Sequence, residues 1–183
     1  MAARLMMRRD AFLTIALMAG AAVACRSVPA LAQSMDQTGG TTRFVKLAAH
    51  TSEFEVAAGQ LAQQRTTNAA VRGFAERMVK DHGELLTTLK AVNDANASAP
   101  LPRGPDDDGR QRIARLGAAS GAEFDVMYME MQIASLEPLL AALREYSRVG
   151  SVESLKSRYS VRYTPVVEEH LRMARTVRGG LTS

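Results

Sequence analysis

The sequence of 183 residues is poor in several residue types on which binding and catalytic sites depend. It contains one cysteine, Cys25, and no tryptophan, and only 5% of its residues are aromatic. A single cysteine excludes an internal disulfide, a thiolate metal cluster and a haem attached through a CxxCH motif. Phosphate-binding glycine loops, nucleophile elbows and paired catalytic carboxylates are also missing. The chain therefore has to fold by packing alone, and its chemistry has to come from other polar residues.

An excess of charge of one sign is also missing once the first residues are set aside. Residues 1–32 carry four of the 23 basic residues and one of the 19 acidic residues, which leaves 19 and 18 for the rest. The basic character of the whole chain therefore belongs mainly to its first segment. This balance argues against a nucleic-acid partner.

The first segment has the order of an export signal. Basic residues come first, an apolar stretch follows at residues 11–24, and small residues come after it. The stretch is too short to span a membrane comfortably, so we expect no transmembrane segment in the mature chain. The motif ALAQ predicts a signal peptide at residues 1–32 cleaved after Ala32. The motif AVAC would instead make Cys25 a lipidated first residue, and an uncleaved anchor is a third reading.

Each of these readings places the protein in the periplasm or at the cell envelope. The run RRDAFL is close to a twin-arginine signal but has one residue too many before the phenylalanine, so the export route stays open.

After a polar tether at residues 33–41, apolar residues recur every three or four positions in four long segments. This spacing predicts an all-α fold, and no segment alternates in the manner of a strand. Asn68 is expected to cap the second helix, and Ser120 with Glu123 forms a capping box for the third. The four helices are expected at about 42–65, 69–93, 121–147 and 151–178, with a short tail at 179–183.

The connections between these segments predict the topology. The first two helices, and likewise the last two, are joined so tightly that each pair should form an antiparallel hairpin. Residues 94–109 lie between the hairpins and can stretch about 50 Å. A helix of this size is about 38 Å long, so the connection can cross the whole bundle, with a short extra helix at 110–118. This is the wiring of a ferritin-like four-helix bundle over residues 42–178, although a short-loop bundle with a floppy linker remains open.

Two of the three histidines interrupt apolar lines. His82 and His170 each stand where a helix is expected to be buried, and Glu55 lies on the buried line of the first helix. Three such groups on inward faces predict a site for one transition-metal ion, which could be zinc, iron or copper. The alternative is that each histidine is a hydrogen-bonded core residue. Asp81 and Glu169 directly precede the histidines and are either orienting groups of the site or charges in solvent.

The remaining histidine and a run of methionines are assigned ordinary roles. His50 falls off the apolar line and is expected at the surface. Met127, Met129 and Met131 alternate along one helix, so they point to different faces and cannot all converge on one copper ion. We expect them to fill the core.

Four segments resemble the exported bacterial ferritin-like proteins grouped as domain of unknown function 4142. They are FVKLAAHTSEFEVAAGQLA, NAAVRGFAERMVKDHGELL, SGAEFDVMY and TPVVEEHLRMA. The most specific element is the Phe-Ala-x-x-Met-Val-x-Asp-His run that ends at His82. The resemblance covers about residues 43–176 and implies a ferritin-like bundle at the periplasm or envelope. It also implies that Glu55, Asp81, His82 and His170 occupy the polar positions typical of the family, whose biochemical role is not established.

The sequence departs from the family pattern in its third helix. Family members usually carry another histidine there, at the place where this chain has Leu136, and Pro138 follows as a possible kink. Val79 and Val167 stand three residues before the two histidines, so the Glu-x-x-His signature of di-iron bundles is missing. Oxygen-activating chemistry is therefore not expected.

These observations favour a non-enzymatic exported protein that binds a ligand, an envelope protein or a second copy of itself, in envelope maintenance or stress tolerance. The alternative is a metal-storing, metal-buffering or metal-sensing bundle that uses Glu55, His82 and His170. An enzyme with an unrecognised site is a third possibility.

Overall fold

The computed structural model describes residues 30–95, 101–149 and 155–182. All regular elements in these ranges are helices, and no strand occurs in them. The helices are α1 (Ala30–Arg65), α2 (Ala69–Ala95), α3 (Asp107–Ala118), α4 (Gly121–Val149) and α5 (Leu155–Gly180). The all-α fold expected from the apolar spacing is therefore confirmed.

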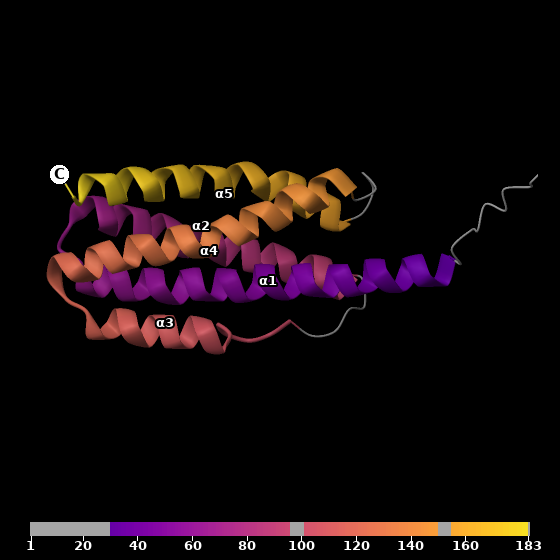
Figure 1. Cartoon of the computed structure of the whole chain (residues 1–183), viewed down its shortest axis with the longest axis horizontal. Helices are drawn as coiled ribbons and strands as arrows, with labels where there is room; N and C mark the ends of the chain where they lie inside the picture. Colours follow the sequence, from indigo (N-terminus) through magenta and orange to yellow (C-terminus); the bar gives the residue numbers. More distant parts are fainter. Residues whose placement is uncertain (1–29, 96–100, 150–154, 183) are drawn as a thin grey trace, which may run out of the picture.

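The four long helices lie side by side along the long axis of the molecule (Figure 1). α1 packs against α2 and α4 packs against α5, and further contacts join α1 to α4 and α2 to α5. α3 lies along the outer side of α1 and also touches α4. The connection between the two helix pairs therefore contains a helix that packs on the others. It corresponds to the short extra helix expected at 110–118.

The turn between α1 and α2 is held by side chains that satisfy the helix ends. The side-chain oxygen of Asn68 accepts hydrogen bonds from the backbone N–H groups of Ala70 and Val71 at 2.9 and 3.2 Å, as its cap position predicted. Arg72 donates to the carbonyl of Gln63 at 2.7 Å and to that of Thr66 at 2.5 Å, which satisfies acceptors at the end of α1.

α1 and α2 come close together at Gly59. A Cβ atom on Gly59 would lie 2.8 Å from Cγ2 of Val79 and 3.1 Å from the carbonyl oxygen of Ala75. Only a residue without a side chain allows this separation, so Gly59 helps to set the register of the two helices.

α3 begins three residues earlier than expected, because Asp106 caps it. The Asp106 side chain accepts from the Gly109 N–H at 2.8 Å. Arg112 then fixes the helix to its neighbours. Its guanidinium lies 4.3 Å from the centre of the Phe54 ring on α1 and donates to the Met131 carbonyl on α4 at 2.7 Å.

The core follows the apolar lines of the first two long helices closely. On α5 the buried face is wider than expected, because this helix packs against both α2 and α4. The line of apolar residues expected there runs through Leu155, Tyr159, Val166, Met173 and Val177; Tyr159 is buried as expected, whereas Val166, Met173 and Val177 are only partly buried. The fully or nearly fully buried apolar residues of α5 are Tyr159, Tyr163, Val167, Leu171 and Ala174.

Two boundaries differ from the expected ones. The backbone is helical from Ala30, so the tether expected at 33–41 forms part of α1, and this end projects beyond the other helices (Figure 1). α4 continues through the exposed Pro138, where the missing backbone hydrogen bond faces solvent.

The expectations for Cys25 and for the start of the last helix at residue 151 lie outside the described residues. Within the described ranges, none of the helices combines the length and apolar character that crossing a membrane requires.

Candidate functional site

His82 on α2 and His170 on α5 face each other inside the helix packing. Both side chains are completely buried, with 0% of their surface exposed. Their ring centroids are 5.4 Å apart and the ring planes are inclined by 36°. The inward orientation expected from the two apolar lines is therefore confirmed for both residues.

One nitrogen of each ring is engaged by a side chain of a neighbouring helix. His82 Nδ1 lies 3.2 Å from Ser52 Oγ on α1. His170 Nε2 lies 2.9 Å from Asp81 Oδ2 on α2, and the nitrogen donates because a carboxylate oxygen only accepts. Asp81 is held in turn by Arg77, whose Nε donates to the same oxygen at 3.2 Å. The two rings are thus held in orientation by side chains of α1 and α2.

The other nitrogen of each ring is buried and has no partner among the described residues. These atoms are His82 Nε2 and His170 Nδ1. Buried polar groups are nearly always hydrogen-bonded, so two unsatisfied imidazole nitrogens on rings in contact are a departure from the usual pattern. The histidine pair is therefore the candidate functional site.

Both imidazoles are held in the neutral form that can act as a ligand. Burial lowers the pKa of His82 well below its usual value, and the neighbouring His170 lowers it further. Burial also lowers the pKa of His170, although the hydrogen bond and charge of Asp81 oppose this shift. Because His170 donates from Nε2, its neutral form carries a lone pair on Nδ1. In the tautomer in which His82 donates to Ser52, its Nε2 carries a lone pair as well.

Glu55 lies one helical turn after Ser52 on α1 and is also completely buried. Its Oε1 accepts a hydrogen bond from the Ser135 hydroxyl on α4, whereas its Oε2 has no partner among the described residues. Burial raises the pKa of Glu55 to about 8, and this rise is opposed by Ser135, Gln132 and the charge of Arg112. The carboxyl is therefore mainly protonated at neutral pH.

The structure thus places two of the three expected ligands, His82 and His170, next to each other. The third, Glu55, has a partner on another helix, α4. Within the described ranges, no group of three or more His, Cys, Asp or Glu side chains is arranged to hold a metal ion. A role for Glu55 as a third ligand stays a prediction.

The two acidic residues beside the histidines have different surroundings. Asp81 reaches His170 across the α2/α5 contact and orients its ring. Glu169 forms a two-bond ion pair with Arg172, at 2.8 and 2.5 Å, on the surface of α5. His50 was expected at the surface, but it is only half exposed and its Nδ1 lies 3.3 Å from the Gly104 carbonyl, which ties α1 to the segment before α3.

Sequence reasoning missed the small polar residues that partner the buried groups. Ser52, Gln132 and Ser135 are all buried, and the last two lie three residues apart on one face of α4. That spacing on an otherwise apolar face was a usable signal. The core-filling role of the methionine run is confirmed, because Met129 is fully buried and Met127 and Met131 pack partly against the core.

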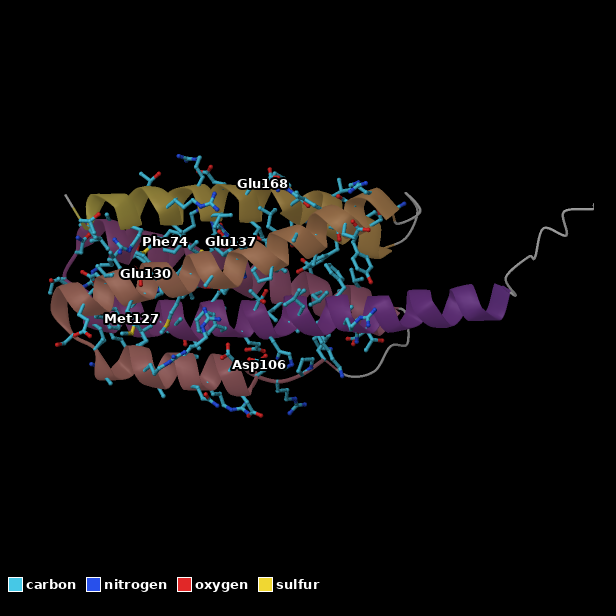
Figure 2. The ribbon with its side chains drawn as sticks, in the orientation of Figure 1. Phe74, Asp106, Met127, Glu130, Glu137 and Glu168 are labelled. Atoms are coloured by element: carbon cyan, nitrogen blue, oxygen red, sulfur yellow. The ribbon has the colours of Figure 1, made fainter. Side chains whose placement is uncertain are left out.

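α4 and α5 are joined on their outer side by ion pairs. Figure 2 labels Glu130, Glu137 and Glu168, which lie along the contact between these two helices. The pairs are Arg178–Glu130 at 2.7 Å, Arg175–Glu137 at 2.9 Å and Arg144–Glu168 at 2.8 Å. A pocket between α4 and α5 is lined by Leu140, Arg144, Glu168, Leu171, Arg172, Arg175 and Thr176. Its three arginines are all paired with carboxylates, so this pocket is a poorer candidate for a ligand site than the histidine pair.

Comparisons with known proteins agree with the resemblance drawn from the sequence. No curated protein and no solved structure gives a significant match to this chain. One protein family does match, described as Domain of unknown function (DUF4142), over residues 26–177. The matched range covers most of the chain. It includes both histidines, the whole of α1, α2, α3 and α4, and α5 except its last three residues. The chain therefore belongs to the DUF4142 family.

Proposed function

We propose that this protein is a non-enzymatic, exported helical protein that binds one transition-metal ion between His82 and His170. The observation that carries the proposal is that each buried ring has one nitrogen held by a neighbouring side chain and the other nitrogen without a partner among the described residues.

The separation of the rings supports a shared ion. A metal–imidazole bond is about 2.1 Å long and the ring centre lies roughly 1.2 Å beyond the nitrogen, so two rings on one ion have centroids about 5.4 Å apart at a tetrahedral ligand angle and about 6.6 Å apart at a linear one. The observed separation of 5.4 Å falls in this range.

The hydrogen bonds around the rings also support ligation. Histidines that bind metals usually donate the other ring N–H to a carboxylate, carbonyl or similar group, which fixes the tautomer and makes the ligating nitrogen more basic. Asp81 has this relationship to His170, and Ser52 has it to His82 in the tautomer that donates from Nδ1. Arg77 keeps the carboxylate of Asp81 in place.

The residues around the pair argue against redox chemistry on oxygen. Val79 and Val167 occupy the positions where a di-iron bundle has glutamates. Leu136, which stands where family members usually carry another histidine, is fully buried and offers no ligand. We therefore propose storage, buffering or sensing of the metal ion rather than oxygen activation.

The topology supports a ferritin-like arrangement. Two pairs of adjacent helices, α1 with α2 and α4 with α5, are connected through a segment that contains α3 and packs along the outside. The export signal at residues 1–32 supports a location in the periplasm or at the envelope, with release after Ala32 or a lipid on Cys25 as the two routes.

Elemental analysis tests the proposal. We expect the purified protein to carry about one equivalent of a transition metal after incubation and desalting, and His82→Ala/His170→Ala to carry none. His50→Ala is the matched control, because it removes a histidine that lies outside the pair. Equal metal content in the double variant and the wild type, with both shown to be folded by circular dichroism, would remove the proposal and leave the histidines as core residues.

A further inference from the structure

We propose that the ion is a soft monovalent cation of the Cu(I) and Ag(I) class, and that the thioether sulfurs of Met78 and Met173 complete its coordination. This inference rests on the proposed function of His82 and His170 and adds two ligands and a metal class to it.

The register of α2 against α5 places the two methionines at the same height. Asp81 meets His170 at 2.9 Å, and Thr88 meets Tyr163 at 2.7 Å. From the first contact to the second, the residue number rises by seven on α2 and falls by seven on α5. The two helices are therefore antiparallel and keep the same register between these contacts. Met78 precedes Asp81 by as many residues as Met173 follows His170, and the two therefore lie opposite each other.

Both methionines lie on the histidine faces of their helices. Met78 precedes His82 by four positions and is fully buried, and Met173 follows His170 by three positions and packs against the core. Residues at these spacings are neighbours on a helix surface and are separated by about 5–6 Å along the axis. Side chains of helices lie over the turn on their N-terminal side, so Met173 extends toward the level of His170 and His82 toward the level of Met78, whereas Met78 itself leans away from His82 and has to reach the site through the flexibility of its side chain.

The charges at the site favour a monovalent ion. An imidazole that binds a metal through its lone pair is neutral and thioethers carry no charge, and the carboxylate of Asp81 is already bonded to His170 and Arg77. Burying an ion without an anionic ligand becomes more costly as its charge rises. A single positive charge is therefore tolerated better here than the double charge of zinc or ferrous iron.

The kinds of ligand present lead to the same metal class. The described ranges offer no third His, Cys, Asp or Glu that is arranged with the histidines to hold an ion. Zinc in proteins is almost always held by three or four such ligands, whereas thioethers select Cu(I). A set of two imidazoles and two thioethers, of which only Met173 is partly exposed, matches Cu(I) and Ag(I).

Competition with a colorimetric Cu(I) chelator under anaerobic, reducing conditions tests the inference. The full-length chain is used with Cys25→Ser, which removes its only thiol. We expect about one equivalent of Cu(I) bound in preference to Zn(II), and a loss of affinity of about tenfold or more in Met78→Leu/Met173→Leu. Leucine has nearly the volume of methionine, so the packing is kept. Met129→Leu is the matched control, since Met129 is equally buried but lies on α4, and its affinity should stay within about twofold of the wild type.

Copper K-edge absorption provides a second measurement that does not depend on any methionine variant. Sulfur in the first coordination shell of Cu(I) on the Cys25→Ser protein supports the inference, because methionine is then the only source of sulfur. A shell of nitrogen and oxygen alone overturns it, as does tighter binding of Zn(II) than of Cu(I), or unchanged Cu(I) affinity in Met78→Leu/Met173→Leu. These results leave the histidine site standing, whereas retention of all metals by His82→Ala/His170→Ala defeats the proposed function itself.

Discussion

His170 donates from Nε2 to Asp81 Oδ2 at 2.9 Å, and this bond joins α5 to α2 at the level of the histidine pair. Asp81 keeps 18% of its side chain exposed while the ring of His170 is completely buried. The bond therefore runs from the rim of the helix packing into its interior and determines which nitrogen of His170 is free inside.

Replacing Asp81 with alanine should weaken metal binding by about 10–100-fold, because the ring of His170 loses the group that fixes its tautomer and raises its basicity. Titration of the purified variant with the metal ion checks this. Glu169→Ala is the control, since Glu169 precedes His170 but pairs with Arg172 at the surface. Equal losses in the two variants would show that only the local negative charge matters.

Glu55 should make the protein less stable as the pH rises. Its pKa is about 8 in the folded state and 4.5 in the reference state, so the folded protein holds the proton more tightly. This contribution to stability is fully present below pH 4.5 and is lost as the pH rises through 8, by at most about 1.4 kcal/mol per pH unit.

The variant Glu55→Gln imitates the protonated carboxyl and should remove this pH dependence. Urea unfolding between pH 5 and 9 measures it, and the difference between variant and wild type isolates Glu55 from the histidines. We expect the variant to gain stability relative to the wild type toward pH 9. Parallel profiles for the two proteins would mean that Glu55 does not change its protonation on unfolding in this interval.

Two glycines on neighbouring helices should respond to alanine with opposite signs. Gly59→Ala places a methyl group 2.8 Å from Val79 Cγ2 and should destabilise the protein by about 1–3 kcal/mol through overpacking. Gly73→Ala meets nothing within 4 Å and should stabilise α2 by about 0.5–1 kcal/mol, because alanine is the better helix former. Thermal unfolding of both variants gives the comparison, and a stable Gly59→Ala protein would contradict the close approach of α1 and α2.

Arg112→Lys should loosen α3 without unfolding the long helices. Lysine cannot reproduce both the planar stack on Phe54 and the bond to the Met131 carbonyl, and the loss is expected at about 1–2 kcal/mol. Hydrogen exchange should accelerate within α3 and change little in α2 and α5. Arg115→Lys, an exposed position on the same helix, serves as the control and should leave exchange unchanged.

The sequence alone determined that the fold is helical and which residues of α1 and α2 are mainly buried, because both follow from local rules, whereas on α5 it gave only part of the buried face. An apolar residue every three or four positions fixes which face of a helix leaves water, so the burial of Glu55, His82 and His170 could be inferred without coordinates. The cap at Asn68 was equally readable, since its acceptor and donors lie within three residues.

Only the tertiary structure decided which residue each buried group meets. The sequence predicted that Glu55, His82 and His170 share one site, but it did not indicate that His82 meets Ser52 or that Glu55, one turn further along α1, bonds to Ser135. A shift of three residues on a helix is only about 4.5 Å along the axis, but it exchanges one contact for another. That register depends on close contacts such as Gly59 against Val79, which join residues distant in the chain and leave no periodic signal in the sequence.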